Sequence, residues 1–262
     1  MHTYYPFTEA LIRTMAKQQL VAAQWPGDLE LRYSLNHCQG DGVSFTGALS
    51  TADLLRLLPV LQSRGLLSDE VTGTLRLFIP LHHTTVQLVV RTPRYCHMNT
   101  VELVVHDFPE DLVAAEYALT GALNREFDGI CARVEIGGYR IIDATHPAEH
   151  NETLLVRRTA NTELRVVVPE PCDFGYCDDE EAVLVRYLEL IDEGARVPGI
   201  EMQVWCNGQR MAQSWIDHVV IRPDAPVRRW LDRDEIRYIA GEARTAILEQ
   251  AEAFRSFLNK VA

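Results

Sequence analysis

Residues 29–49 read LELRYSLNHCQGDGVSFTGAL, and this stretch constrains the fold more than any other part of the chain. Two runs of strand-favouring residues flank a corner at residues 38–42 (CQGDG). Glycine adopts positive φ without strain, and an aspartate between two glycines can hydrogen-bond its own backbone. The segment therefore predicts a β-hairpin, in which two strands adjacent in sequence pair antiparallel.

The rest of the chain alternates helical patterns with groups of strand patterns. Helical patterns cover residues 8–24, 50–61, 111–127, 178–193 and 232–258. Strand patterns cover residues 74–79, 85–91, 100–107, 153–158, 163–168, 200–206 and 209–221. Strands that follow one another directly favour antiparallel or mixed sheets. The sequence thus predicts an α+β fold, with antiparallel or mixed sheets built from hairpins and packed with about five helices.

Several residues predict where these elements begin and break. Ser50 and Asp53 have the spacing of a capping box, and Pro59 in the run that follows predicts a kink or two short helices. Gly137 and Gly138 predict a chain break before residues 139–143.

A linker is predicted near residues 144–151, where the chain reads ATHPAEHN. This divides the chain into an N-terminal α+β half over residues 1–144, which contains the CQGDG hairpin, and a C-terminal α+β half over residues 151–262. The C-terminal half contains an acidic helix and a long final helix. A single domain is the alternative organisation, since 262 residues can form either one large domain or two smaller ones.

Acidic charge is concentrated in the middle of the chain. Residues 101–200 carry 8 basic and 21 acidic side chains, a net of −13, whereas the net charge of the whole chain is −12. This region repels a phosphate backbone, so we expect no direct binding to nucleic acid. It favours instead a basic protein or nucleoprotein complex as partner. Solubility alone is the alternative explanation.

The chain shows no membrane or export signal. No apolar run approaches the ~20 residues that cross a bilayer, and the start MHTYYPFTEA lacks the basic and apolar regions of a signal peptide. Six scattered cysteines favour reduced thiols over a disulfide framework. We therefore predict a cytoplasmic protein without a membrane partner.

The helix predicted over residues 178–193 has one acidic face. At 100° per residue, its acidic side chains fall within about 120° of one face, and Leu184, Tyr187, Leu188 and Ile191 fall on the opposite one. This pattern predicts a docking face for an arginine- and lysine-rich partner, with a solvated surface as the alternative. Gln39 and Asp41 of the hairpin corner are further candidate contacts. The acidic candidates are Asp178, Glu181, Glu189, Asp192 and Glu193.

Catalytic signals are weak. Cys38 could act as a nucleophile with Asp41 as its orienting group, but neighbours on a strand point to opposite faces, so His37 and Cys38 do not form a natural pair. No paired CxxC, HExxH, GxxxxGK[ST] or GxSxG motif occurs. We therefore expect no catalytic residue, no metal and no cofactor. A small thiol-dependent hydrolase built on Cys38 is the alternative, and it requires a depressed thiol pKa.

The residues Tyr33-Ser34-Leu35, followed by CQGDGVSF over residues 38–45, resemble a motif of uncharacterised proteins from bacteriophages and plasmids. This resemblance implies a mobile-element origin. Small acidic proteins of such elements often inhibit host defence, as anti-restriction and anti-CRISPR proteins do. The resulting hypothesis is a non-enzymatic inhibitor that binds a host nucleic-acid-targeting defence complex through an acidic surface. A structural or assembly protein of a virus particle is a further alternative.

Overall fold

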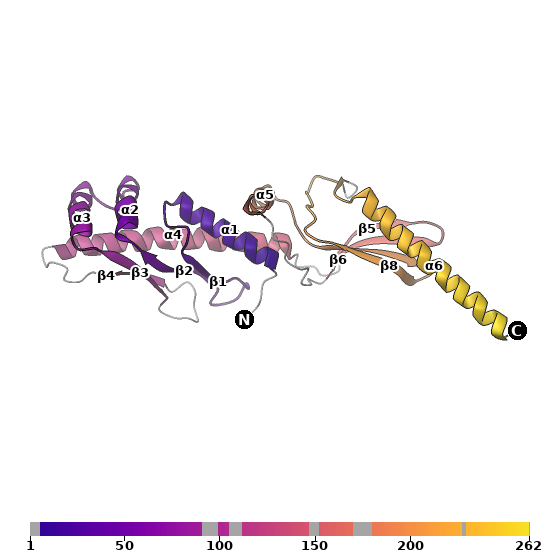
Figure 1. The fold of residues 1–262 in the computed structure, drawn as a ribbon. Coiled ribbons are helices and arrows are strands. Elements are labelled where there is room, and N and C mark those ends of the chain that lie inside the picture. Colours follow the sequence, from indigo (N-terminus) through magenta and orange to yellow (C-terminus); the bar gives the residue numbers. More distant parts are fainter. Residues whose placement is uncertain are drawn as a thin grey trace. The chain divides into compact units, whose positions relative to one another are not determined.

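The computed structural model describes residues 6–90, 99–104, 112–146, 152–169, 180–226 and 229–261. These ranges contain six helices and eight strands, and all strand pairs are antiparallel. The predicted α+β class is confirmed. The chain divides into two compact units, one containing Glu9–Tyr139 and the other containing Arg140–Ala262 together with Phe7 and Thr8. The elements are labelled in Figure 1.

The first unit is built on a four-stranded sheet with the order β1-β2-β3-β4. β1 and β2 form the predicted hairpin, with Leu31 opposite Phe45 and Tyr33 opposite Val43. Phe45 and Phe127 of α4 are both fully buried, and their ring centroids lie 6.2 Å apart. The elements are α1 (Pro6–Ala22), β1 (Glu30–Ser34), β2 (Gly42–Leu49), α2 (Thr51–Ser63), α3 (Asp69–Leu81), β3 (Thr85–Val90), β4 (Asn99–Val104) and α4 (Val113–Thr145).

The strand predicted over residues 74–79 is wrong, because this stretch lies inside α3. Ser68 caps the helix by accepting a hydrogen bond from the backbone N–H of Val71, and Asp69 and Glu70 follow in the first turn. The buried residues Thr72, Leu75 and Ile79 recur at helical spacing. Capping and packing therefore outweigh the β-propensity of this stretch, which is why there are six described helices instead of about five.

The chain break predicted at Gly137 and Gly138 is also wrong, because α4 continues through both glycines. A Cβ on Gly138 would lie 2.4 Å from Cδ1 of Leu35, and one on Gly137 would lie 3.0 Å from Cε of Met15. These glycines therefore allow α4 to pack closely against α1 and the β1–β2 connection. The division between the two units falls just after them, before the predicted linker.

The capping box predicted at Ser50 and Asp53 is confirmed: Ser50 accepts from the backbone N–H of Asp53, and the Asp53 carboxylate accepts from the backbone N–H of Ser50. Pro59 lies inside α2, which forms one helix and not two.

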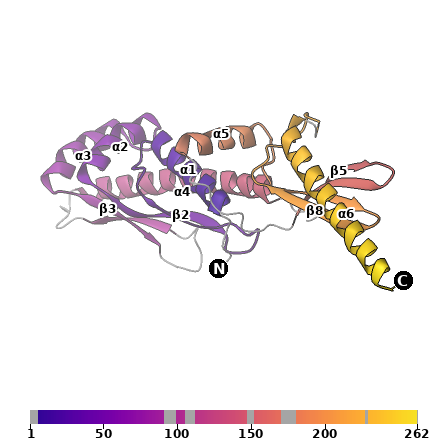
Figure 2. The same cartoon turned by 45° about the vertical axis from the view of Figure 1, so that its right-hand side comes forward.

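The second unit contains a four-stranded sheet with the order β5-β6-β7-β8. One face of this sheet supplies Val166, Met202 and Val204 to a core that Ile239 and Ala243 of the last helix complete. This helix lies across the sheet and continues beyond it (Figures 1 and 2). The elements are β5 (Glu152–Arg158), β6 (Thr162–Val168), α5 (Glu181–Asp192), β7 (Ile200–Cys206), β8 (Gln209–Ile216) and α6 (Arg233–Val261).

None of the helices in the described ranges is long and apolar enough to span a bilayer.

Candidate functional site

The predicted acidic face lies on α5, which is anchored by its opposite side. Leu184, Leu188 and Ile191 are buried, and the ring of Tyr187 meets that of Phe7 edge-on at 5.2 Å. Glu181, together with the other described acids of the face, is exposed. Asp178, the remaining candidate, lies outside the described residues. Buried contacts on one side of α5 therefore fix the position of the helix, and the acidic residues on its other side are exposed. These residues are Glu181, Glu189, Asp192 and Glu193.

Arginines of the same unit contact three of these carboxylates. Arg186 bonds Glu189 at 2.6 Å, Arg140 bonds Asp192 at 2.5 Å, and Arg222 lies 3.8 Å from Glu193. The three acidic side chains remain 55–69% exposed. Exposed ion pairs contribute about 0–1 kcal/mol, so the guanidinium groups of a partner could replace these arginines. Helical periodicity located the acids but could not reveal Arg140, which lies on α4, or Arg222, which lies in the connection between β8 and α6.

The hairpin corner is organised around the carboxylate of Asp41. Its Oδ2 accepts from the backbone N–H groups of Asn36 at 2.6 Å and Cys38 at 3.0 Å, and from the hydroxyl of Tyr139 at 2.8 Å. Its Oδ1 accepts from Ser34 Oγ at 3.1 Å. The connection between the strands is therefore a seven-residue loop, residues 35–41, wider than the tight corner that the sequence predicts.

This network decides which candidate residues of the corner face outward. The carboxylate of Asp41 accepts hydrogen bonds from Ser34 and Tyr139, whereas the side chain of Gln39 is exposed. The ring of His37 packs against that of Tyr139, with centroids 4.5 Å apart and the ring planes tilted by 32°. His37 and Gly40 both adopt positive φ, at 54° and 98°. Asp41 therefore holds the loop shape, and Gln39 is the better candidate contact.

Electrostatics at the corner oppose a nucleophilic Cys38. The thiol donates a hydrogen bond to Asp41 Oδ1 at 3.2 Å, and this bond, with some desolvation and the negative charge of Asp41, raises the pKa of Cys38. Desolvation alone would raise the pKa of Asp41, but the hydrogen bonds from Cys38, Tyr139 and Asn36 outweigh it and lower that pKa to about 2. The hydrolase alternative requires the opposite shift at Cys38.

We expect Cys38 to react slowly with iodoacetamide at pH 8 despite its exposure, because the thiolate is the reactive form. Asp41→Asn removes the neighbouring negative charge, so alkylation should become about threefold faster. Mass spectrometry of the Cys38 peptide measures the rate, and Asp28→Asn, an exposed acid just before β1, is the matched control. Fast alkylation of the unaltered chain would favour the hydrolase instead.

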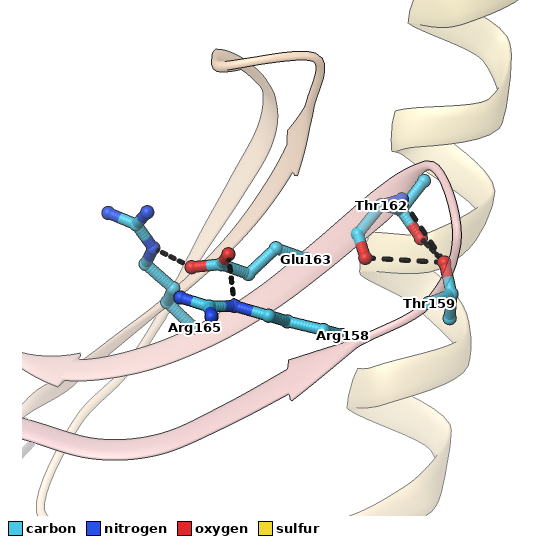
Figure 3. Close-up of polar contacts among 5 residues, drawn as sticks. All are labelled: Arg158, Thr159, Thr162, Glu163 and Arg165. Carbon is cyan, nitrogen blue, oxygen red and sulfur yellow. Dashed lines mark hydrogen bonds and ion pairs between the residues drawn. The ribbon is translucent and has the colours of Figure 1, made fainter.

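A second polar cluster, which the sequence analysis missed, lies at the tip of the β5–β6 hairpin. Figure 3 shows Glu163 between two guanidinium groups, and Arg158 Nε donates to Glu163 Oε2 at 2.8 Å while Arg165 donates to Oε1. The hydrogen bonds of Arg165, together with those of Arg158, lower the pKa of Glu163. Thr159 and Thr162 close the turn, with their hydroxyl oxygens 2.7 Å apart.

This hairpin tip borders a shallow hollow of about 250 Å³. The guanidinium carbon of Arg165 lies 4.8 Å from the ring centroid of Trp205, a cation–π contact, and Asn207 and Gly208 line the far side. Glu163 offsets one of the two guanidinium charges and bonds both arginines, so the hollow offers a single net positive charge whose donors are already partly engaged. The predicted hairpin could have revealed part of this cluster, since it places Arg158 directly opposite Glu163.

No group of three metal-ligating side chains is present within the ranges that the structure describes. Cys96, Cys172 and Cys177, the other cysteines near acids or histidines in the sequence, lie outside those ranges.

Residues 152–258 match a protein family described as the C-terminal domain of YubG. The match begins at the first residue of β5 and ends in the last turn of α6, so it spans the second sheet, α5 and α6. The description names no activity. No solved structure matches the chain.

Proposed function

We propose that this chain is a non-enzymatic binding protein that docks onto a basic protein through the acidic face of α5 (Glu181, Glu189, Asp192 and Glu193). A partner that binds this face must present a surface rich in arginine and lysine, and such surfaces are typical of proteins that bind nucleic acid. The partner we propose is a host nucleic-acid-targeting defence complex, and the outcome is its inhibition. The CQGDGVSF motif, which resembles proteins of bacteriophages and plasmids, supports this choice of partner.

The exposed carboxylates of α5 are the observation that carries this proposal. They lie on α5 and its C-cap residue Glu193, and the other side of this helix is buried, so a partner would meet them in a defined arrangement. The arginines beside them form exposed pairs, which a partner can exchange for its own at little cost. The raised thiol pKa of Cys38 argues against the enzymatic alternative.

The proposal is tested by a pull-down from bacterial lysate with the tagged full-length chain. We expect the unaltered chain to recover a basic, nucleic-acid-binding protein, identified by mass spectrometry. Reversing Glu189, Asp192 and Glu193 to lysine should reduce that recovery at least tenfold, because attraction becomes repulsion. Recovery should also fall as salt is raised, since exposed charges are screened.

A matched variant reverses three exposed acids elsewhere in the chain: Asp28, Asp224 and Glu242. It changes the net charge by the same amount but leaves α5 intact, so it should recover the partner as the unaltered chain does. Circular dichroism checks that both variants are folded. If the α5 reversal and this control bind equally well, the acidic face is not the docking surface.

A further inference from the structure

The helix α6 packs against one face of the second sheet, and the other face carries a different set of side chains. Successive residues of a strand point to opposite faces, so the sequence neighbours of Val166, Met202 and Val204 point away from α6. The strand register aligns these neighbours in rows that cross the sheet. We call two of these rows, together with Trp215 of β8, the sheet platform. The first row is Arg158, Glu163, Trp205 and Arg210, and the second is Val156, Arg165, Gln203 and Gln213.

The sheet platform is more positive than the chain as a whole. Its three arginines pair with Glu163, which Figure 3 shows between two of them, and with Glu201 beside the rows. The arginine side chains are 40–73% exposed, whereas those of Glu163 and Glu201 are 18% and 8% exposed. The net of −13 over residues 101–200 does not describe this face, because that sum includes the acids of α5. A ligand that approaches the platform meets the arginines first, which favours an anion.

Two indole rings lie among these arginines. Trp205 is fixed in place, because its Nε1 donates to Gln203 Oε1 at 2.9 Å and the guanidinium carbon of Arg165 lies 4.8 Å from its ring centroid. Trp215 is 41% exposed and lies opposite Glu201, so it is about 13 Å from Trp205 along the strand direction. Aromatic rings beside cationic side chains are the combination that binds single-stranded nucleic acid, through stacked bases and neutralised phosphates.

The hollow of about 250 Å³ at the hairpin tip adjoins Trp205. Asn161 and Asn207 also line it, and their amides can both donate and accept hydrogen bonds, as the edges of bases do. Cavities for drug-sized ligands measure about 300–1,000 Å³, so this hollow suits a smaller planar group, such as one base. An acidic protein segment would use the arginines but would leave the indoles and amides without a role. Single-stranded nucleic acid uses all three.

We infer that the sheet platform binds single-stranded nucleic acid, with bases stacked on Trp205 and Trp215 and phosphates bound by the arginines. Within the described residues, each of these guanidinium groups donates one of its five N–H groups to a carboxylate, so the others can bind phosphate. The net charge of the chain is −12, so we expect weak binding, with a Kd on the order of 100 µM. The inference is independent of the proposed function, because the platform and the acidic face of α5 share no residue.

Fluorescence anisotropy of a labelled oligothymidylate of about ten nucleotides measures this binding, with the full chain titrated to about 500 µM at low salt. Three phosphate contacts on a single strand predict that log K falls with log salt with a slope of about −2. Trp215→Ala should weaken binding at least fivefold, because it removes one stacking surface. Trp215 is partly exposed, so the variant should fold, and circular dichroism verifies this. A chain that gives no anisotropy change up to the highest concentration overturns the inference.

Two residues of α6 provide matched controls, one for an exposed ring and one for an exposed, paired arginine. Arg158 and Arg237 are 73% and 76% exposed, and each lies 2.8 Å from a carboxylate of the same chain. Arg158→Ala should weaken binding at least threefold, whereas Arg237→Ala should not change it. Tyr238→Ala removes a ring that is 61% exposed, and it is the control for Trp215→Ala. If a variant of the platform and its α6 control bind equally well, the inference is wrong.

Competition identifies the class of ligand. A duplex of the same length should displace the labelled strand at least tenfold less well than unlabelled oligothymidylate, because its bases are already stacked on one another. Oligoglutamate of the same length tests an acidic protein as the alternative ligand, and it should also compete at least tenfold less well because it has no rings to stack. Competition by the duplex or by oligoglutamate that equals that of oligothymidylate would show that the platform recognises negative charge alone, and this would overturn the inference.

Discussion

The free energy of unfolding of the second unit should be about 2 kcal/mol lower at pH 5 than at pH 7, because His146 is held neutral in the folded chain. Burial lowers the pKa of His146 to about 4, against about 6.5 in an unfolded chain. Its Nε2 lies 2.9 Å from the hydroxyl oxygen of Thr8.

The direction of this effect follows from proton binding. As the pH falls through 6.5, the unfolded state gains a proton that the folded state does not bind until about pH 4. The folded state therefore has its full free energy of unfolding, as far as His146 affects it, above pH 6.5. That free energy falls as the pH is lowered from 6.5 to 4. Urea unfolding at pH 7, 6 and 5 measures it by tryptophan fluorescence, since three of the four tryptophans, Trp205, Trp215 and Trp230, lie in this unit. A Trp25→Phe background removes the signal of the first unit.

His146→Gln removes the titrating group and should remove most of the difference between pH 5 and pH 7. His83→Gln, which changes an exposed histidine in the first unit, should leave the difference in place. If the His146→Gln variant still loses about 2 kcal/mol between these pH values, other groups are responsible.

The fold could be predicted where local patterns and packing agree. The hairpins at residues 30–49 and 200–216 carry alternating apolar residues and turn residues such as Asn207-Gly208, and both form. Residues 74–79 show the limit of this reasoning. Their Thr, Leu and Ile side chains favour a strand, but the cap at Ser68 and burial at helical spacing decide for α3. Propensity is a weak prior when tertiary packing opposes it.

The candidate sites were harder to predict because their partners are distant in sequence. Periodicity placed Glu189 and Asp192 on one face of a helix, but Arg140 reaches Asp192 from a position 52 residues away. Tyr139 lies 98 residues from Asp41, in α4, where Gly137 and Gly138 predict a chain break instead of a helix. Local spacing cannot encode such contacts. The Arg158–Glu163 pair, by contrast, follows from hairpin register alone.

Arg64→Ala should lower the free energy of unfolding of the first unit by about 3 kcal/mol. Arg64 is the C-cap residue of α2, and its guanidinium bonds the carboxylate of Glu126 on α4. The Glu126 side chain is only 9% exposed, so water cannot replace the lost partner well. Breaking one side of a buried ion pair costs about 3–5 kcal/mol, and the partial exposure of Arg64 places this pair at the lower end. Urea unfolding at pH 7 measures the change.

Arg56→Ala is the control that distinguishes the effect of leaving a buried charge unpaired from the effect of losing any ion pair. Arg56 also lies on α2 and bonds Asp53 at 2.8 Å, but its side chain is 51% exposed, so the loss should stay below about 0.5 kcal/mol. Glu126→Gln should reduce the penalty of Arg64→Ala, because the glutamine leaves no buried charge behind. A penalty that is equal for Arg64 and Arg56, or that Glu126→Gln leaves unchanged, would show that burial of the Glu126 charge does not determine the strength of this contact.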